Sequence, residues 1–187
     1  MEMKVKFLFV IIFLGMVLGI YPESNGQTRG SSPVIHFAWA QDGIRQGNDW
    51  RIYLSATDPD GDMSKIFCRI DQPGNNLYRL DITRIKKGLE GQLDGYLVLR
   101  TYSPQDLFGL SLTLTVIIAD GAGNESRPVT FPLTINGEKM KTLPSDLAQP
   151  NLEKLLNQRL GYIGIDLMRR ERNGARGLDG SAEDFPG

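Results

Sequence analysis

The sequence predicts an all-β fold: an antiparallel β-sandwich of about seven strands, followed by a C-terminal amphipathic helix and a disordered tail. Two observations carry the prediction of a sandwich. Between residues 33 and 136, apolar and polar side chains alternate in short runs, which is the period of a half-buried strand. Clusters of Asp, Asn, Gly and Pro separate these runs and leave little room for helices. This arrangement is typical of two packed antiparallel sheets.

Each strand is predicted from its own pattern. The first run has Ile35, Phe37 and Trp39 on one side, which we interpret as the side facing the core. The second run places Trp50, Ile52, Leu54 and Ala56 on one face, and Arg51, Tyr53, Ser55 and Thr57 on the other. The expected strands are Pro33–Gln41, Asp49–Thr57, Ser64–Asp71, Leu77–Ile85, Gln92–Arg100, Ser111–Ala119 and a last one marked by Val129, Phe131, Leu133 and Ile135.

Short turn motifs connect these strands. Asp42-Gly43 follows the first strand, Asp58–Asp62 the second and Pro73–Asn76 the third. Asp and Asn side chains bond to nearby backbone, Pro presets φ, and Gly permits the reversal. The segment Ser103–Gly109 begins with Ser-Pro, a pair suited to the cap and first residue of a helix. We therefore expect one helical turn there, as the crossover between the fifth and sixth strands.

The first 26 residues have the pattern of an export signal. Lys4 and Lys6 precede the apolar run Phe7–Ile20, and small residues follow at Ser24 and Gly26, as in secretory signals. Spanning a bilayer takes about 20 apolar residues, so this shorter run favours a cleaved signal over the alternative of an uncleaved anchor. We expect cleavage after Gly26 and a protein that is periplasmic, on the cell surface or secreted.

Composition limits the classes of partner. The chain has 21 basic and 22 acidic residues, a balance that does not favour nucleic acid or an anionic membrane as the main partner. Cys68 is the only cysteine, so an intramolecular disulfide is excluded and the domain depends on core packing. Because Cys68 alternates with Ile66 and Ile70, it is predicted to be a small buried side chain. We expect a linker at 27–32, a sandwich at 33–137 and a second linker at 138–150.

Two turn motifs carry a resemblance to known modules. The segment Leu54–Asp62 follows a strand that contains Trp50, and the segment Val116–Ser126 contains Asp-Gly-Ala-Gly-Asn. Both resemble strand exits of bacterial immunoglobulin-like, cadherin-like and fibronectin-type-III-like modules. The resemblance implies an immunoglobulin-like connectivity and a role as an extracytoplasmic binding or spacer module. The chain departs from antibody-type domains because it has no cysteine pair and has Phe108 where a corner tyrosine is expected.

The acidic turn after the second strand is a candidate metal site. In a seven-stranded sandwich the second and sixth loops lie at one end, which brings Asp58, Asp60 and Asp62 towards Asp120 and Asn124. Calcium takes six to eight oxygen ligands, and carboxylates on adjoining loops supply several. The alternative is that these residues only shape the turns, because their spacing does not match the helix–loop–helix calcium loop.

Aromatic residues and the single histidine are candidates for other sites. Phe37 and Trp39, with Tyr53, Phe67 and Tyr102, are candidates for a sugar-binding platform, although a strand face that carries Ile35, Phe37 and Trp39 is more typical of core. His36 is the only histidine, so a catalytic triad or a transition-metal site is not indicated. We expect no enzymatic activity and, calcium apart, no cofactor.

The C-terminal region predicts a helix at 151–172 and a disordered tail at 173–187. Asn151 is a suitable cap, and one apolar stripe recurs at helical spacing: Leu152, Leu155, Leu156, Leu160, Ile163 and Leu167. Gly161 and Gly164 weaken this helix. An isolated helix of this length is marginal in water, so we expect it to pack either on its own sandwich or on a partner, including a second copy of the chain.

Together these observations predict an exported, non-enzymatic binding or assembly module of the cell envelope. We expect it to contact a protein partner, or itself, through the sandwich and the apolar stripe. The alternative is a calcium-dependent adhesion or carbohydrate-binding domain.

Overall fold

The computed structural model describes residues 30–74, 78–139 and 151–168. The predicted export signal, the first part of the linker at 27–32, most of the linker at 138–150 and the predicted tail at 173–187 lie outside these residues. In the described part of the chain, no helix is both long enough and apolar enough to cross a membrane.

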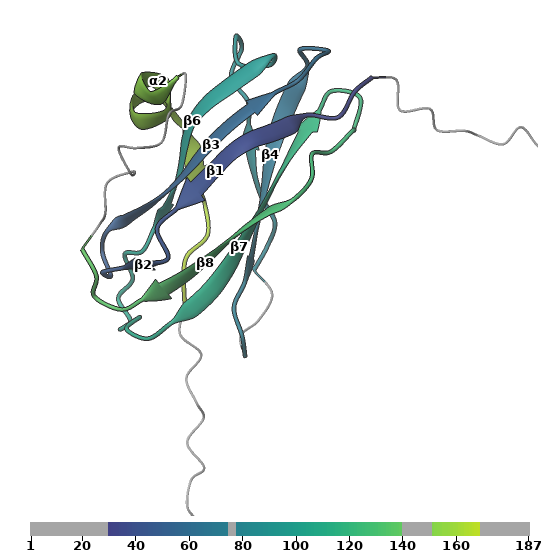
Figure 1. Ribbon diagram of the computed structural model, residues 1–187. Helices are drawn as coiled ribbons and strands as arrows, with labels where there is room; N and C mark the ends of the chain where they lie inside the picture. The colour runs from purple at the N-terminus through teal and green to yellow at the C-terminus, as the bar shows by residue number, and fades with distance from the viewer. Residues whose placement is uncertain (1–29, 75–77, 140–150, 169–187) are drawn as a thin grey trace, which may run out of the picture.

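Two β-sheets form the body of the protein (Figure 1). Along the described residues the elements are β1 (Val34–Ala40), β2 (Gly43–Ile44), β3 (Asp49–Thr57), β4 (Met63–Asp71), β5 (Asp81–Arg84), β6 (Gln92–Arg100), β7 (Ser111–Asp120), β8 (Val129–Ile135), α2 (Leu152–Asn157) and β9 (Arg159–Ile163). One sheet has the order β1-β3-β6-β9 and the other the order β2-β8-β7-β4-β5. The prediction of an all-β fold is confirmed. The expectation of wholly antiparallel pairing is wrong, because β2 pairs with β8 and β9 with β6 in parallel.

The core lies between the two sheets, where the alternating apolar side chains predicted it. The inward side chains of β3, β4 and β7 are almost fully enclosed: Trp50, Ile52, Leu54, Ile66, Cys68, Ile70, Leu112, Leu114, Val116 and Ile118. The prediction that Cys68 is buried is confirmed, and burial, with the nearby charge of Asp81, raises the pKa of its thiol. Burial of this apolar surface is the main term that stabilises the fold.

Strand β1 departs from the predicted alternation. Its pairing with β3 is antiparallel, but the register shifts between Ile35 and Phe37. A bulge of this kind inserts one residue and moves the following side chains to the other face. Ile35 therefore packs on the main core, whereas Phe37 and Trp39 lie on the outer face of the four-stranded sheet. The expectation that all three share the core face is wrong.

The segment 103–109 is a crossover between the two sheets, but it is not helical. Its backbone is shaped by local side chains: the Phe108 N–H donates to Asp106 Oδ1 at 2.9 Å. The Gln46 side-chain amide donates to the carbonyl of Gln105 at 2.7 Å and accepts from the Leu107 N–H at 2.8 Å. These bonds satisfy backbone groups without a helix, and Leu107 is completely buried.

The predicted helix at 151–172 is replaced over most of its described length by other structure. Helix α2 has only six residues and ends before Gln158, which is extended, and β9 follows directly. The Asn151 side chain does not cap α2; its amide donates to Asp94 Oδ2 at 2.9 Å instead. Gly161 permits the placement of this strand, because a Cβ there would lie 2.6 Å from Thr83 Cγ2. Strand β9 thus approaches β5 closely while it pairs with β6.

This docking decides between the two alternatives for the apolar stripe. Leu155, Leu160, Ile163 and Leu167 are at most 5% exposed, and each is packed on the chain's own sandwich. These four side chains are not available to a partner, so the prediction that they form a partner surface is wrong. Leu156 remains 36% exposed, and Leu152 is half-buried against the outer aromatic cluster.

Candidate functional site

The acidic turn predicted as a metal site joins β3 to β4. Asp58 is 4% exposed and organises this turn. Its Oδ1 accepts from the Asp60 N–H at 3.3 Å, and its Oδ2 accepts from the Asp62 N–H at 3.2 Å. Asp58 therefore performs the turn-shaping role that was the alternative to a metal ligand.

Asp120, at the end of β7, is held in the same way by the next loop. Its Oδ1 accepts from the Asn124 N–H and its Oδ2 from the Asn124 side-chain amide, both at 2.7 Å. Desolvation alone would raise the pKa of Asp120, but hydrogen bonds from the Asn124 side chain and from neighbouring backbone N–H groups outweigh it. The pKa of Asp120 lies below its ordinary value.

The fold brings three of the five predicted ligands together. Carboxylate oxygens of Asp58, Asp62 and Asp120 all lie within 4.8 Å of one another. Asn124 joins the group through its bonds to Asp120, whereas Asp60 turns away and accepts from the Ser31 N–H.

Asp62 is the member of this group without a full set of partners. Its Oδ1 is enclosed and accepts no hydrogen bond within the described residues. Desolvation, a hydrogen bond to Asp58 and the charges of Asp120 and Asp58 raise the pKa of the Asp62 carboxyl. Three carboxylates this close repel one another, so the cluster suits a proton or a hard cation.

Aromatic and arginine side chains form a second group, on the outer face of the four-stranded sheet. Trp39 on β1 is paired with Tyr53 on β3, Tyr53 with Tyr96 on β6, and Tyr96 with Arg159 on β9. Ring centroids are 5.8 Å apart for Trp39 and Tyr53, and 5.7 Å apart for Tyr53 and Tyr96. These cross-strand aromatic contacts form one row across the sheet.

Three arginines lie among these rings. The guanidinium of Arg51 is 4.9 Å from the centroid of Tyr96, and those of Arg100 and Arg159 are 4.5 Å and 4.4 Å from the centroid of Tyr162. Arg159 also donates to the Tyr162 hydroxyl. We call the surface formed by Trp39, Tyr53, Tyr96, Tyr162, Arg51, Arg100 and Arg159 the arginine–aromatic face.

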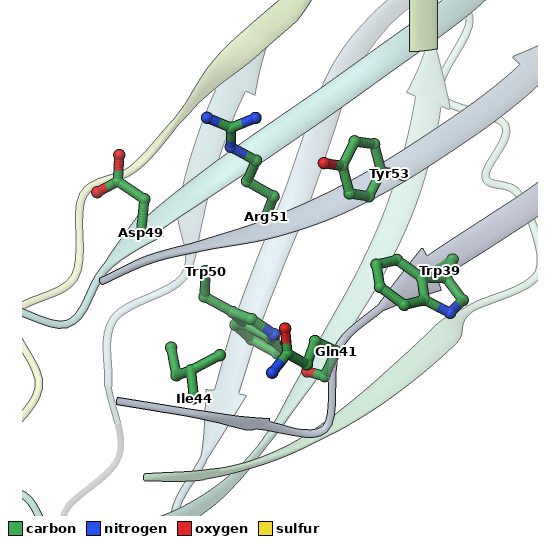
Figure 2. A pocket seen from close by; sticks show the side chains of 7 residues that line it. All are labelled: Trp39, Gln41, Ile44, Asp49, Trp50, Arg51 and Tyr53. Atoms are coloured by element: carbon green, nitrogen blue, oxygen red, sulfur yellow. Dashed lines mark hydrogen bonds between the residues drawn. The ribbon is translucent and has the colours of Figure 1, made fainter. Parts of the chain in front are cut away.

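No carboxylate in the described residues forms an ion pair with Arg51, Arg100 or Arg159. Figure 2 shows Asp49, Arg51 and Tyr53 projecting from one side of β3 and Trp50 from the other. Asp49 is thus near Arg51 on the same strand but does not pair with it. The Nε of Arg51 is enclosed and has no hydrogen-bond partner in the part of the chain that the structure describes.

Helix α2 covers one end of this face. Leu152 and Leu155 pack on Tyr53 and on the half-buried rings of Phe37, Trp39 and Tyr96. Of the aromatic residues weighed for a sugar platform, Phe37, Trp39 and Tyr53 are brought together. Phe67 belongs to β4 of the other sheet, and Tyr102 lies in the exposed crossover loop. The predicted platform is therefore only partly assembled.

Two shallow hollows border the arginine–aromatic face. One is lined by Trp39, Gln41, Ile44, Asp49, Trp50, Arg51 and Tyr53 (Figure 2). The other is lined by Arg100, Tyr162, Ile163, Gly164, Ile165 and Asp166. Each of these hollows has one arginine and one carboxylate among its lining residues.

The sequence alone did not identify this face. The alternation at 49–57 placed Arg51 and Tyr53 on the polar side, and the same alternation at 92–100 places Tyr96 and Arg100 there. The spacing of the C-terminal leucines predicts a helix for Arg159 and Tyr162 and therefore does not connect them to the sheet. Comparison with protein families, with curated proteins and with solved structures finds no match to this chain.

Proposed function

We propose that this chain is a non-enzymatic binding module that acts outside the cytoplasm and binds its ligand on the arginine–aromatic face. The export pattern of residues 1–26 supports the location. The observation that carries the proposal is the set of three guanidinium groups that rest on tyrosine rings and have no carboxylate partner among the described residues. Charged groups without a partner at a surface are available to a ligand of opposite charge.

Strand order supports an immunoglobulin-like sandwich for this module. In the constant-type arrangement, the first, second, fifth and fourth strands form one sheet and the third, sixth and seventh form the other. Strands β1, β3 and β6 match the first sheet, and β4, β7 and β8 match the second. The position of the fourth strand is taken by β9, because β5 pairs with β4. The C-terminal strand thereby adds Arg159 and Tyr162 to the face.

Co-sedimentation with envelope fragments of the source cells tests the binding role. We expect the wild-type chain to sediment with the fragments and a triple variant, Arg51→Ala, Arg100→Ala and Arg159→Ala, to remain in solution. A matched control is Lys65→Ala, Arg69→Ala and Arg84→Ala, which removes the same charge from exposed positions of the other sheet. Equal sedimentation of both folded triple variants would contradict the proposal. Protease treatment of the fragments separates a protein partner from a non-protein one.

A second function, calcium binding at the acidic cluster, is favoured by the Oδ1 of Asp62, which is enclosed and accepts no hydrogen bond from the described residues. In this proposal calcium bridges Asp58, Asp62 and Asp120 and fixes the loops at that end of the sandwich. Calcium should raise the melting temperature of the wild-type chain by several degrees, and EDTA should reverse the rise. Asp60→Asn should keep this response and Asp62→Asn should lose it. A wild-type melting temperature that is independent of calcium would leave the turns with a structural role only.

A further inference from the structure

We infer that the arginine–aromatic face binds an acidic polysaccharide whose carboxylates lie on separate sugar rings. This inference rests on the proposed function of the face and specifies its ligand. It follows from the way the guanidinium groups are held, from their spacing and from the charges around them.

Two tyrosines of this face, Tyr96 and Tyr162, hold arginine guanidinium groups on their rings. Tyr162 has two guanidinium groups within 4.5 Å of its centroid, and Tyr96 has one at 4.9 Å. A guanidinium held on a ring loses less freedom on binding, and its planar fork matches a carboxylate with two parallel hydrogen bonds. The guanidinium groups of the face are therefore suited to carboxylates.

The three guanidinium groups come from three different strands. Val98 of β6 is paired with Arg51 on one side and with Tyr162 on the other, and Arg100 follows two residues later. Neighbouring strands are about 4.8 Å apart, so the anchor points on β3 and β9 are separated by about 10 Å. A small anion with one acid group supplies one partner for the three guanidinium groups. A chain of sugars with one acid group per ring supplies several.

Nearby acidic groups oppose a densely charged polymer. Asp49 is exposed and paired in register with Arg100, and Asp166 lines the hollow beside Tyr162. The net charge of the chain is −1. Duplex DNA carries about one charge per 1.7 Å, which these carboxylates would repel. A polyuronate has fewer charges, and its hydroxyls can donate to Asp49 and Asp166.

Two aromatic rings of the face, those of Trp39 and Tyr53, have no guanidinium contact in the described residues, and Tyr53 is buried. Trp39 is half-buried and lies next to the hollow that contains Asp49 and Arg51 (Figure 2). The apolar face of a sugar ring packs on such an indole while its carboxylate meets Arg51. The face thus combines an apolar contact with charge recognition.

Binding to polygalacturonate tests this inference, with dextran, dextran sulfate and single-stranded oligothymidylate as comparison polymers. Using calorimetry at moderate salt, we expect binding to polygalacturonate and none to neutral dextran. The Arg51, Arg100 and Arg159 triple alanine variant should bind at least tenfold more weakly, and the Lys65, Arg69 and Arg84 control should match the wild type. Replacing the same three arginines by lysine keeps the charge but removes the fork, and it should also weaken binding several-fold.

The outcomes separate the two proposals. Arginine-dependent binding to dextran sulfate or oligothymidylate, with none to polygalacturonate, would overturn the carboxylate inference and leave the binding role of the face intact. Arginine-dependent binding to envelope fragments, with no binding to polygalacturonate, would also overturn the carboxylate inference and leave the binding role of the face intact. Full retention of wild-type affinity in the lysine triple variant would also overturn the inference. Failure of the alanine triple variant to reduce envelope binding would instead contradict the proposed function.

Discussion

Replacing Gly95 of β6 by alanine is expected to displace β9 from the sheet. A Cβ at this position would lie 2.3 Å from the carbonyl oxygen of Gln158 and 2.9 Å from Leu160 Cδ2. The Gln158 oxygen accepts the Tyr96 N–H at 2.9 Å. A backbone oxygen cannot rotate away as a flexible side chain does, so the start of β9 must move and this hydrogen bond must lengthen or break.

The expected loss of stability follows from what β9 and the residues after it bury. Leu160, Ile163 and Leu167 are 5%, 4% and 2% exposed. Full burial of such a side chain contributes about 1.5–3 kcal/mol, and the Tyr96 hydrogen bond adds about 1 kcal/mol. Displacement that exposes one of these side chains therefore costs about 3 kcal/mol. That is a large part of the 5–15 kcal/mol that stabilises a typical domain.

Urea denaturation and hydrogen exchange measure this effect. Gly91→Ala is a matched control because its Cβ would meet only Gly61 Cα at 3.7 Å, and neither Gly91 nor Gly95 has a positive φ. We expect the control to change the free energy of unfolding by less than about 0.5 kcal/mol. Gly95→Ala should also lose amide protection across β9. A Gly95→Ala variant as stable as the control, with β9 still protected, would refute the docking of β9 on β6.

Three further predictions test other parts of the structure. Leu160→Asp should lower the free energy of unfolding by more than about 4 kcal/mol or prevent folding, because it buries a charge in the core. Leu156→Asp should lower it by less than about 1 kcal/mol. Equal shifts of the melting temperature in the two variants would argue against the docking of residues 151–168 on the sandwich. The pKa of Asp62 is raised in the folded protein, so its protonated form stabilises the fold at low pH and this contribution is lost as pH rises through the raised pKa. Asp62→Asn should therefore have a higher melting temperature than the wild type in EDTA at pH 7, and this difference should disappear near pH 3. A difference in calorimetric melting temperature that stays constant between pH 3 and pH 7 would contradict repulsion among the carboxylates. Burial raises the pKa of the Cys68 thiol, so a thiol reagent should react with it only in urea; rapid labelling of the native protein would place Cys68 outside the core.

Local patterns predicted the strands that bury one face. Trp50, Ile52 and Leu54 alternate without interruption, and β3 runs from Asp49 to Thr57 as expected. Strand β6 likewise runs from Gln92 to Arg100 as expected. Their period of two reflects a pleated backbone with one side in the core, and this depends on nearest neighbours along the chain. Turn residues such as Asp58 could likewise be assigned from their own chemistry.

The structure of the C-terminal segment 151–168 could not be predicted from its local pattern. Leu152, Leu155 and Leu156 have helical spacing and do begin a helix. Leu160 and Ile163 continue that spacing, but they belong to a strand that needs β6 as its partner. A sequence pattern does not contain the free energy of pairing with a strand some 60 residues away, nor the close approach to Thr83 that Gly161 allows.

The all-β class, the buried cysteine and the core-facing side of each regular strand follow from the amino-acid sequence, because each depends on alternation along a single segment. The positions of Trp39, Arg159 and Tyr162 depend on how distant segments pack. A bulge in β1 reverses the alternation, and β9 is added to the sheet in parallel. Both depend on contacts between distant segments, and together they assemble the arginine–aromatic face.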